Sequence, residues 1–358
     1  MSTLTLTRSP RYIRSTTFSN AIKVKLELYI FTGLVGSKPA TATYTIEKDT
    51  INSEEEVTFE INELVRDYYE IAFSGGYSTS TGQTLWVIAD LTPFSSSAVG
   101  STSSDTFLAF DGYNYFQEPA SVGGSINATY TLPILLSAAK VQVLDTDFAQ
   151  IPVNAEIAED VNFKLNGVTV STHSITDTGN TNQKIQYVTT SASNVDEVEV
   201  VYNSGASTET RTIELIDECK FPVSKIVLVN KLGALQNLYF FKKSVETLDV
   251  KKENFERNIL DATLPYIFGK KFTEHQIKDY NIIANESLVL NSGFVSESMN
   301  ESFKQLLLSQ YVWIVASGDT LPVNVTSSNL TYKTGLNDRL INYTLNFKYA
   351  FDTINNVH

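Results

Sequence analysis

Residues that could supply nucleophilic, acid–base or metal chemistry are scarce in this chain. The 358 residues include three histidines, His173, His275 and His358, and one cysteine, Cys219. A nucleophile with its base, or a metal centre, needs several such side chains in one place. Acidic residues directly precede Cys219 and disfavour a reactive thiolate there. The sequence therefore predicts no catalytic residue, no metal site, no bound cofactor and no enzymatic activity.

Three stretches rich in side-chain oxygen atoms could take part in acid catalysis or in calcium binding. Glu54, Glu55 and Glu56 are consecutive, whereas a glycosidase needs two carboxylates on opposite sides of a sugar. We interpret this run as a solvated edge before a strand. Residues 145–150, DTDFAQ, and 176–182, TDTGNTN, contain closely spaced oxygen ligands. Neither stretch matches the twelve-residue calcium loop with its alternating acids, central glycine and closing glutamate.

Aromatic side chains raise the possibility of a binding surface. The chain has 18 tyrosines and 20 phenylalanines, and residues 111–117, DGYNYFQ, combine Tyr113, Tyr115 and Phe116 with polar neighbours. Exposed rings of this kind stack on sugars, so a carbohydrate-binding or adhesive β-sandwich protein is one interpretation. In a β-rich chain such rings also face the core or a subunit partner. Both interpretations stay open at this point.

The negative overall charge argues against partners that are themselves negatively charged. The formal net charge is −13, whereas nucleic acids and anionic membranes are bound by basic patches. The first residues lack the apolar segment of a signal peptide, and no later stretch reaches eighteen apolar residues. We therefore expect neither a nucleic-acid nor a membrane partner.

The patterning of apolar residues predicts mainly strands. Residues 22–31 alternate Ile, Val, Leu, Leu and Ile with mostly polar residues, which is typical of a strand with one buried face. One short helix is expected after Asn62, which is placed to cap it. Asn166 and Gly167 lie between two alternating runs and predict a two-residue hairpin, and a longer hairpin is expected around residues 203–207.

These segments group into three expected domains. We predict an N-terminal β-sandwich-like domain with one helix over residues 1–130. A small immunoglobulin-like β-sandwich is expected over residues 131–218. Residues 219–358 are expected to form a β-rich assembly domain that carries a helix near residues 298–310. Polar stretches at 94–105 and 118–125 are expected to be loops, and the second is also a candidate linker. The predicted fold class is thus mainly β, with several sandwich domains.

The last third carries the residues that we expect to build the assembly core. Ser298 and Glu301 have the spacing of a capping box before an apolar helix face, and that face is expected to cover the final strand. Gly233 is expected to make the turn between two strands. The predicted core and assembly residues are Gly233, Leu235, Leu238, Phe240, Phe303, Leu306, Leu307, Tyr343, Leu345 and Phe347.

The same third resembles a known group of proteins. The stretches ECKFPVSKIVLVNKLGALQNLYFFKKS, DVKKENFERN and FKQLLLSQYVWI, with LPVNVTSSNLTYKTGLNDRLINYTLNFKYAF, resemble virion structural proteins of tailed bacteriophages of Bacteroidota hosts, over roughly residues 215–352. By analogy with tail-tube and distal-tail rings, the resemblance implies a symmetric ring of identical subunits in a tail, baseplate or neck. It further implies contacts with other tail, baseplate or fibre proteins, location in the virion, and a charged segment at 249–258 that is available to a neighbour.

Overall fold

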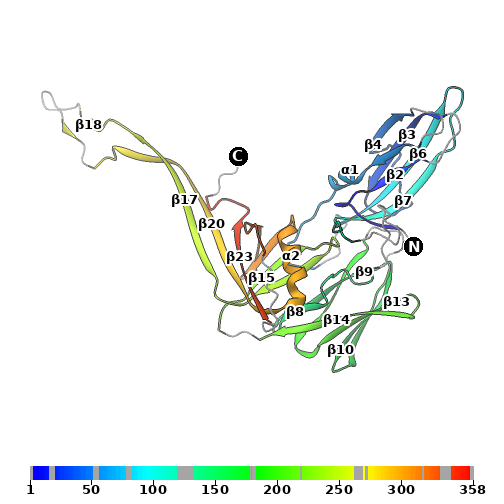
Figure 1. The fold of residues 1–358 in the computed structure, drawn as a ribbon. Coiled ribbons are helices and arrows are strands. Elements are labelled where there is room, and N and C mark those ends of the chain that lie inside the picture. The colour runs from blue at the N-terminus through cyan, green and yellow to red at the C-terminus, as the bar shows by residue number, and fades with distance from the viewer. Residues whose placement is uncertain are drawn as a thin grey trace.

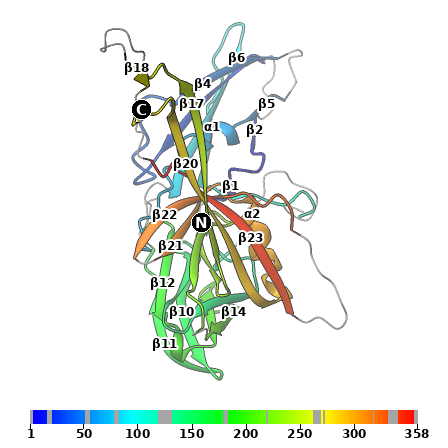
Figure 2. The same cartoon turned by 90° about the vertical axis from the view of Figure 1, so that its left-hand side faces the viewer.

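The chain is mainly β-structure arranged in three groups of sheets (Figures 1 and 2). The computed structural model describes residues 3–15, 21–50, 56–77, 83–118, 132–177, 179, 183–217, 220–261, 269–270, 273–316, 318–330 and 340–354. The expected fold class, several β-sandwich-like units with one packed helix near the C-terminus, is confirmed. Within these residues, no helix is both long enough and apolar enough to cross a membrane.

The first group is a five-stranded sheet covered on one face. Its strand order is β1-β7-β6-β3-β4, and the small pair β2–β5 and helix α1 share its core. The elements are β1 (Thr3–Leu6), β2 (Tyr12–Arg14), β3 (Ala21–Phe31), β4 (Tyr44–Asp49), β5 (Thr58–Glu60), α1 (Asn62–Arg66), β6 (Thr84–Ser95) and β7 (Ser103–Phe110). The predicted alternation of β3 holds for the residues from Val24 to Ile30 but not for Ile22, which is exposed. The pairing of β3 with β6 shifts register between Ala21 and Lys23, and this irregularity removes Ile22 from the buried face.

The second group is a small sandwich of two sheets. One sheet has the order β11-β10-β13-β14-β8 and the other consists of β12 and β9, with one apolar core between them. The elements are β8 (Lys140–Leu144), β9 (Phe148–Asn154), β10 (Ala158–Leu165), β11 (Val168–Ser174), β12 (Ile185–Ser191), η2 (Ala192–Asn194), β13 (Glu197–Tyr202) and β14 (Ser207–Ile216). Asn166 and Gly167 have φ angles of 51° and 77°, so the predicted two-residue hairpin is confirmed. The longer hairpin at 203–207 is confirmed as well.

The third group is a seven-stranded sheet with the order β16-β15-β21-β22-β23-β20-β17. Its elements, with the small pair β18–β19, are β15 (Ser224–Val229), β16 (Leu235–Phe240), β17 (Val245–Glu256), β18 (Leu260–Asp261), β19 (Gly269–Lys270), β20 (Ile277–Ser296), η3 (Glu297–Met299), α2 (Asn300–Leu308), β21 (Val312–Ala316), β22 (Asp319–Val325) and β23 (Leu340–Tyr349). Each of the three groups takes its strands from one of the three expected segments.

Helix α2 packs on this sheet as the apolar spacing predicts. The rings of Phe303 and Tyr343 have centroids 4.7 Å apart, and Phe240 contacts both Phe303 and Phe347. Leu306 is fully buried in the same core. Of the other predicted members, Leu238 and Leu345 lie in this core and Leu307 packs partly against it, whereas Leu235 is buried on the opposite face of the sheet.

Both predicted helix caps are wrong. Helix α2 begins at Asn300, its N-cap position is Met299, and no side chain caps it. Ser298 lies in the preceding 3-10 turn, and its hydroxyl is bonded to Ser296 instead. Asn62 is the first residue of α1 rather than its cap. In both cases burial of one helix face against a sheet determines where the helix begins, because packing outweighs a cap that contributes about 1 kcal/mol.

Candidate assembly surface

A long hairpin of β17 and β20 projects from the body of the molecule (Figure 1). All twelve residues of β17 are exposed, as are the first seven of β20, Ile277 to Ile283. Strand β23 pairs with β20 only between Ser287 and Ser296. Beyond that point the hairpin is a ribbon of two strands, which we call the arm: residues 248–256 of β17 and 277–286 of β20. At about 3.3 Å per residue, β17 alone spans about 40 Å.

The arm exposes large apolar side chains. Those exposed by more than a third are Leu248, Val250, Phe255, Ile277, Tyr280, Ile282 and Ile283. The rings of Phe255 and Tyr280 contact each other across the two strands, with centroids 5.8 Å apart. An isolated two-stranded hairpin is marginally stable in water, and exposed apolar clusters mark interaction surfaces. The arm therefore has the features of a surface that another molecule covers.

Local backbone geometry bends the arm. The pairing of β17 with β20 shifts register between Lys251 and Glu253, and β20 contributes one extra residue there. Asn281 has a positive φ of 47° at this position. Such a bulge increases the local twist of a ribbon and interrupts its edge. At the arm's base, the backbone N–H of Thr353 donates to Ala284 and ties the C-terminal segment to the hairpin.

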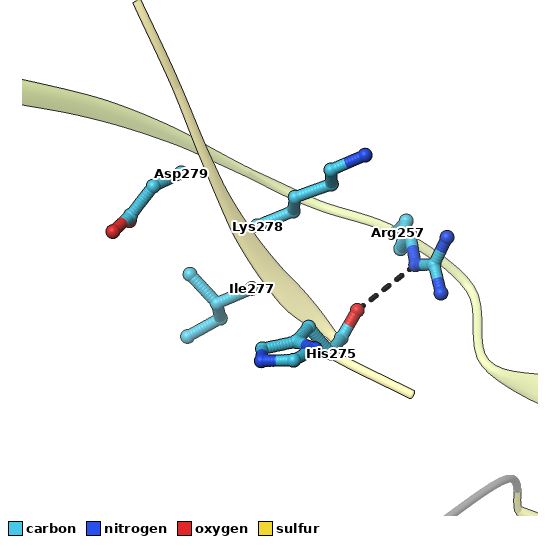
Figure 3. A pocket seen from close by; sticks show the side chains of 5 residues that line it. All are labelled: Arg257, His275, Ile277, Lys278 and Asp279. Carbon is cyan, nitrogen blue, oxygen red and sulfur yellow. Dashed lines mark hydrogen bonds between the residues drawn. The ribbon is translucent and has the colours of Figure 1, made fainter. Parts of the chain in front are cut away.

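A cavity of about 430 Å³ lies near the outer end of the arm (Figure 3). It is lined by Arg257, His275, Ile277, Lys278 and Asp279. The Nε of Arg257 donates to the His275 carbonyl at 2.9 Å, and its guanidinium pairs with Glu274. Throughout the described part of the chain, no three His, Cys, Asp or Glu side chains are grouped to hold a metal ion. The lining thus combines two cations, Arg257 and Lys278, with one carboxylate, Asp279, and the imidazole of His275.

The turn that contains Gly233 lies at the junction of the three groups of sheets. Gly233 has a φ of 81°, and a Cβ there would lie 3.1 Å from the backbone nitrogen of Asp111. The buried Asn230 side chain accepts from the backbone N–H groups of Leu232 and Ala234 and donates to the Leu135 carbonyl at 2.7 Å. The turn thus needs a residue without a side chain, and its contacts fix the three groups to one another.

An apolar core surrounds this turn and joins all three groups. Its buried members are Leu4, Leu6, Trp86, Leu108, Phe110, Leu135, Ile185, Leu232 and Ala234. A neighbouring core joins Phe73 from the segment after α1 to Val227, Val229, Leu235 and Trp313 of the C-terminal sheet. Burial of this kind stabilises by about 25 cal/mol per Å² of apolar surface, so the three groups share part of their stability.

The three aromatic residues considered for sugar stacking are placed differently from one another. Tyr113 is only 9% exposed and Arg8 lies over its ring, so the expectation of a ligand-facing ring is wrong there. The Tyr115 hydroxyl donates to Glu301 at 2.9 Å, and Lys304 lies over its ring, which places Tyr115 between the N-terminal sheet and α2. Phe116 is fully exposed. No stacking platform of three rings is therefore formed.

Asp147, from the stretch considered for calcium, belongs to an interdomain contact. Its carboxylate accepts from Lys225 Nζ and from the Tyr239 hydroxyl, each at 2.8 Å. Burial by itself would raise the pKa of Asp147, but the hydrogen bonds from Lys225 and from the Phe148 backbone outweigh burial and lower this pKa. The carboxylate is thus charged and joins the middle sandwich to the C-terminal sheet.

The two histidines that the structure describes, His173 and His275, belong to different groups of sheets. His173 is on β11, where its ring contacts that of Phe163 at 5.7 Å. Cys219, His358, Glu54, Glu55, most of the second calcium candidate (178 and 180–182) and most of the 118–125 stretch lie outside the described residues. Nothing in the structure brings His173 near His275.

Sequence reasoning missed the arm as an element. Neither β17 nor the outer half of β20 is among the strands expected from the sequence. Apolar residues along β17 do not alternate strictly, so the period-two signal is absent. The available signal is the mixture of charged and apolar residues at 249–258, for which the resemblance implies only a segment open to a neighbour.

Comparisons with known proteins add little. A scan against protein-family models finds no match, and no curated protein matches the sequence. Among solved structures, the periplasmic chaperone SfaE is similar over 58% of this chain and 92% of that chain, with 10% identity and a TM-score of 0.19. A likeness this weak carries no argument about the fold or the function of this chain.

Proposed function

We propose that this protein is a non-enzymatic structural subunit of a tailed bacteriophage virion. In this proposal identical copies form a symmetric ring in the tail, baseplate or neck, with six or twelve copies as the expected numbers. The observation that carries it is the arm: a projecting two-stranded ribbon with exposed apolar side chains along most of its length. The resemblance of the C-terminal third to virion proteins gives the class of particle.

Ring closure would bury the apolar side chains that the arm exposes, and this burial would stabilise the ring. Removing apolar surface from water contributes a favourable free energy of about 25 cal/mol per Å² when a partner covers it. A head-to-tail contact between identical copies repeats, and in a closed ring every arm is covered. The N-terminal sheet and the middle sandwich then lie beside the ring body, where their loops are available to other virion proteins such as fibres.

The test compares three forms of the full-length chain. The arm variant carries Leu248→Ser, Val250→Ser and Phe255→Ser. The control variant carries serine at Val99, Val168 and Val170, which are at least as exposed but lie on the N-terminal and middle groups. Light scattering over a range of concentrations and negative-stain electron microscopy give the size and shape of each form.

We expect rings from the wild type and from the control, and monomers with an unchanged melting temperature from the arm variant. A wild-type chain that stays monomeric at high concentration, and that forms no ring in an assembled particle, would exclude the proposed function. Rings that form equally well in all three forms would show that the arm does not carry the contact.

A further inference from the structure

A cavity in the N-terminal group lies between the chain that follows β3 and the chain that follows α1. Its volume is about 480 Å³, within the range of about 300–1,000 Å³ that is usual for small-molecule sites. Its floor includes two buried side chains, Ile30 of β3 and Leu85 of β6. Its rim carries four exposed residues, Thr32, Ser37, Tyr68 and Glu70. The cavity thus has an apolar floor and a polar rim that is open to solvent.

The chain between β3 and β4, which forms one side of the rim, is tied to the sheet. Lys38 in this connection pairs with Asp90 of β6, and its Nζ lies 3.8 Å from the centroid of the Tyr29 ring. The backbone N–H of Thr43 donates to the Leu28 carbonyl at 2.8 Å. These contacts hold the rim in place without a ligand, and a pre-organised site loses less conformational entropy when it binds one.

Tyr68 supplies an aromatic surface to this cavity. Its side chain is 39% exposed, and its ring makes a T-shaped contact with Tyr44 of β4, with centroids 6.0 Å apart. This contact positions the Tyr68 ring and leaves part of it uncovered. The face of an aromatic ring carries partial negative charge, which attracts the weakly positive C–H groups on one side of a sugar ring.

The polar groups of the rim are available to a ligand. In the described part of the chain, no hydrogen bond or ion pair involves the side chains of Thr32, Ser37 or Glu70. A carboxylate accepts hydrogen bonds and donates none, so a ligand at Glu70 has to be a donor. Neighbouring hydroxyls of a sugar are donors of this kind, and hydrogen bonds to a charged acceptor are strong.

The charge of the lining narrows the class of ligand. Of the described lining residues only Glu70 is charged, whereas the cavity at the outer end of the arm has three charged residues. The nearby Lys38 is engaged by Asp90 and is not part of the lining. An anionic ligand would meet the Glu70 carboxylate without a compensating cation. A single exposed carboxylate also contributes little to binding a cation. A neutral ligand with several hydroxyls is therefore favoured.

We propose that this cavity binds a neutral sugar unit of a glycan. One side of the sugar ring packs on Tyr68, and neighbouring hydroxyls donate to the Glu70 carboxylate. Thr32 and Ser37 bond the remaining hydroxyls from the other side of the rim. The whole site belongs to the N-terminal group, so sugar binding does not require ring formation.

Titration of the full-length chain with simple glycosides, followed by ligand-observed NMR, tests this site. The probes are the methyl glycosides of glucose, galactose, mannose and N-acetylglucosamine, with N-acetylneuraminic acid as the acidic comparison. We expect saturable binding of at least one neutral glycoside, with a Kd of about 0.1–10 mM because a single sugar unit buries little surface. Tyr68→Ala and Glu70→Gln should each weaken this binding about tenfold.

Two matched variants serve as controls. Phe116→Ala removes a fully exposed ring away from the cavity, and Glu60→Gln neutralises an exposed carboxylate on β5. Both should bind the glycoside as the wild type does, and circular dichroism melts verify that all four variants fold. No saturable binding of a neutral glycoside, or stronger binding of N-acetylneuraminic acid, would overturn the proposal. Binding that survives both cavity substitutions, or that is lost with Phe116→Ala, would place the sugar elsewhere and overturn it as well.

The sugar site and the ring can be tested separately. The arm variant should bind the glycoside with the affinity of the wild type, and Tyr68→Ala should form rings normally. Rings without sugar binding would overturn only the sugar site, whereas sugar binding by a chain that never forms rings would exclude only the proposed function.

Discussion

The two edge strands of the C-terminal sheet differ in what covers them. Strand β16 is buried along nearly its whole length and contacts β8 and β9 of the middle sandwich. Asn237 on β16 donates to Gln150 at 2.7 Å, and Tyr239 donates to Asp147. Strand β17, at the other edge, is exposed at all twelve positions. One chain thus covers one edge with its own domains and leaves the other uncovered.

This difference between the two edges separates the residues that stabilise the monomer from those that are open to contacts between molecules. Natural proteins protect exposed edge strands with charges, bulges or a covering element, because an open edge pairs with other chains. The arm carries charges of both signs and a bulge at Asn281, yet it retains several exposed large apolar residues. We infer that the covered side holds the monomer together, whereas the open side serves contacts between molecules. Substitutions on the two sides should therefore change different measurements.

The largest effect on stability is expected at the covered side, in the core under α2. Leu306→Ala removes a fully buried side chain, and comparable core truncations cost about 2–5 kcal/mol of unfolding free energy. Leu308→Ala on the same helix is the control, since Leu308 is 44% exposed and should change stability by less than about 0.5 kcal/mol. Denaturant unfolding measures both. Equal losses in the two variants would show that the helix does not depend on this core.

The next largest effect is expected at the junction turn. Gly233→Val places a side chain at a φ of 81° and within 3.1 Å of the Asp111 backbone, so we expect a loss of about 1–3 kcal/mol. Gly167→Val is matched in backbone angle, with a φ of 77°, but has no atom within 4 Å of the added Cβ. The difference between the two melting temperatures therefore reports the close contact with Asp111. Identical losses would indicate that only the backbone angle matters.

The sequence predicts short-range features of this molecule well and long-range ones poorly. The Asn166–Gly167 hairpin follows from two residues that accept positive φ, and the burial of Tyr343, Leu345 and Phe347 follows from strict alternation. The junction around Gly233 depends instead on residues far away in the sequence, such as Asp111 and Leu135. Local spacing contains no information about such contacts.

The candidate surface was the hardest part to predict for a related reason. Burial is what imposes a period of two on a strand, and the arm has no buried face. Its residues are free to mix charged and apolar types, so the pattern resembles that of a loop. The predicted cap of α2 is wrong because of burial rather than its absence. Packing of α2 against the sheet outweighs the Ser298–Glu301 spacing.

A smaller effect with a defined pH dependence is expected at Asp147, between the covered edge and the middle sandwich. Its pKa is lowered in the folded state, so its carboxylate stabilises the fold above the unfolded pKa, about 3.9, and this contribution is lost as the pH falls through the lowered value. Asp147→Asn should cost about 1–2 kcal/mol at pH 7 and progressively less toward pH 3. Urea unfolding at both pH values checks this. A loss that does not change with pH would mean that the charge of Asp147 is unimportant.

The smallest effect on stability is expected on the arm itself. Leu248 is 55% exposed and lies opposite Glu286, so Leu248→Ser should change the unfolding free energy of the monomer by less than about 0.5 kcal/mol. The same substitution at Leu238, which is fully buried near the covered edge, should unfold the C-terminal group, because it places a hydroxyl in an apolar core. Denaturant unfolding of dilute monomer gives both values, and light scattering at high concentration gives assembly. If Leu248→Ser destabilised the monomer substantially, the arm would be packing against its own chain, and its apolar residues would no longer indicate a neighbouring molecule. A stable monomer that has lost assembly would instead show that this edge contributes only between copies.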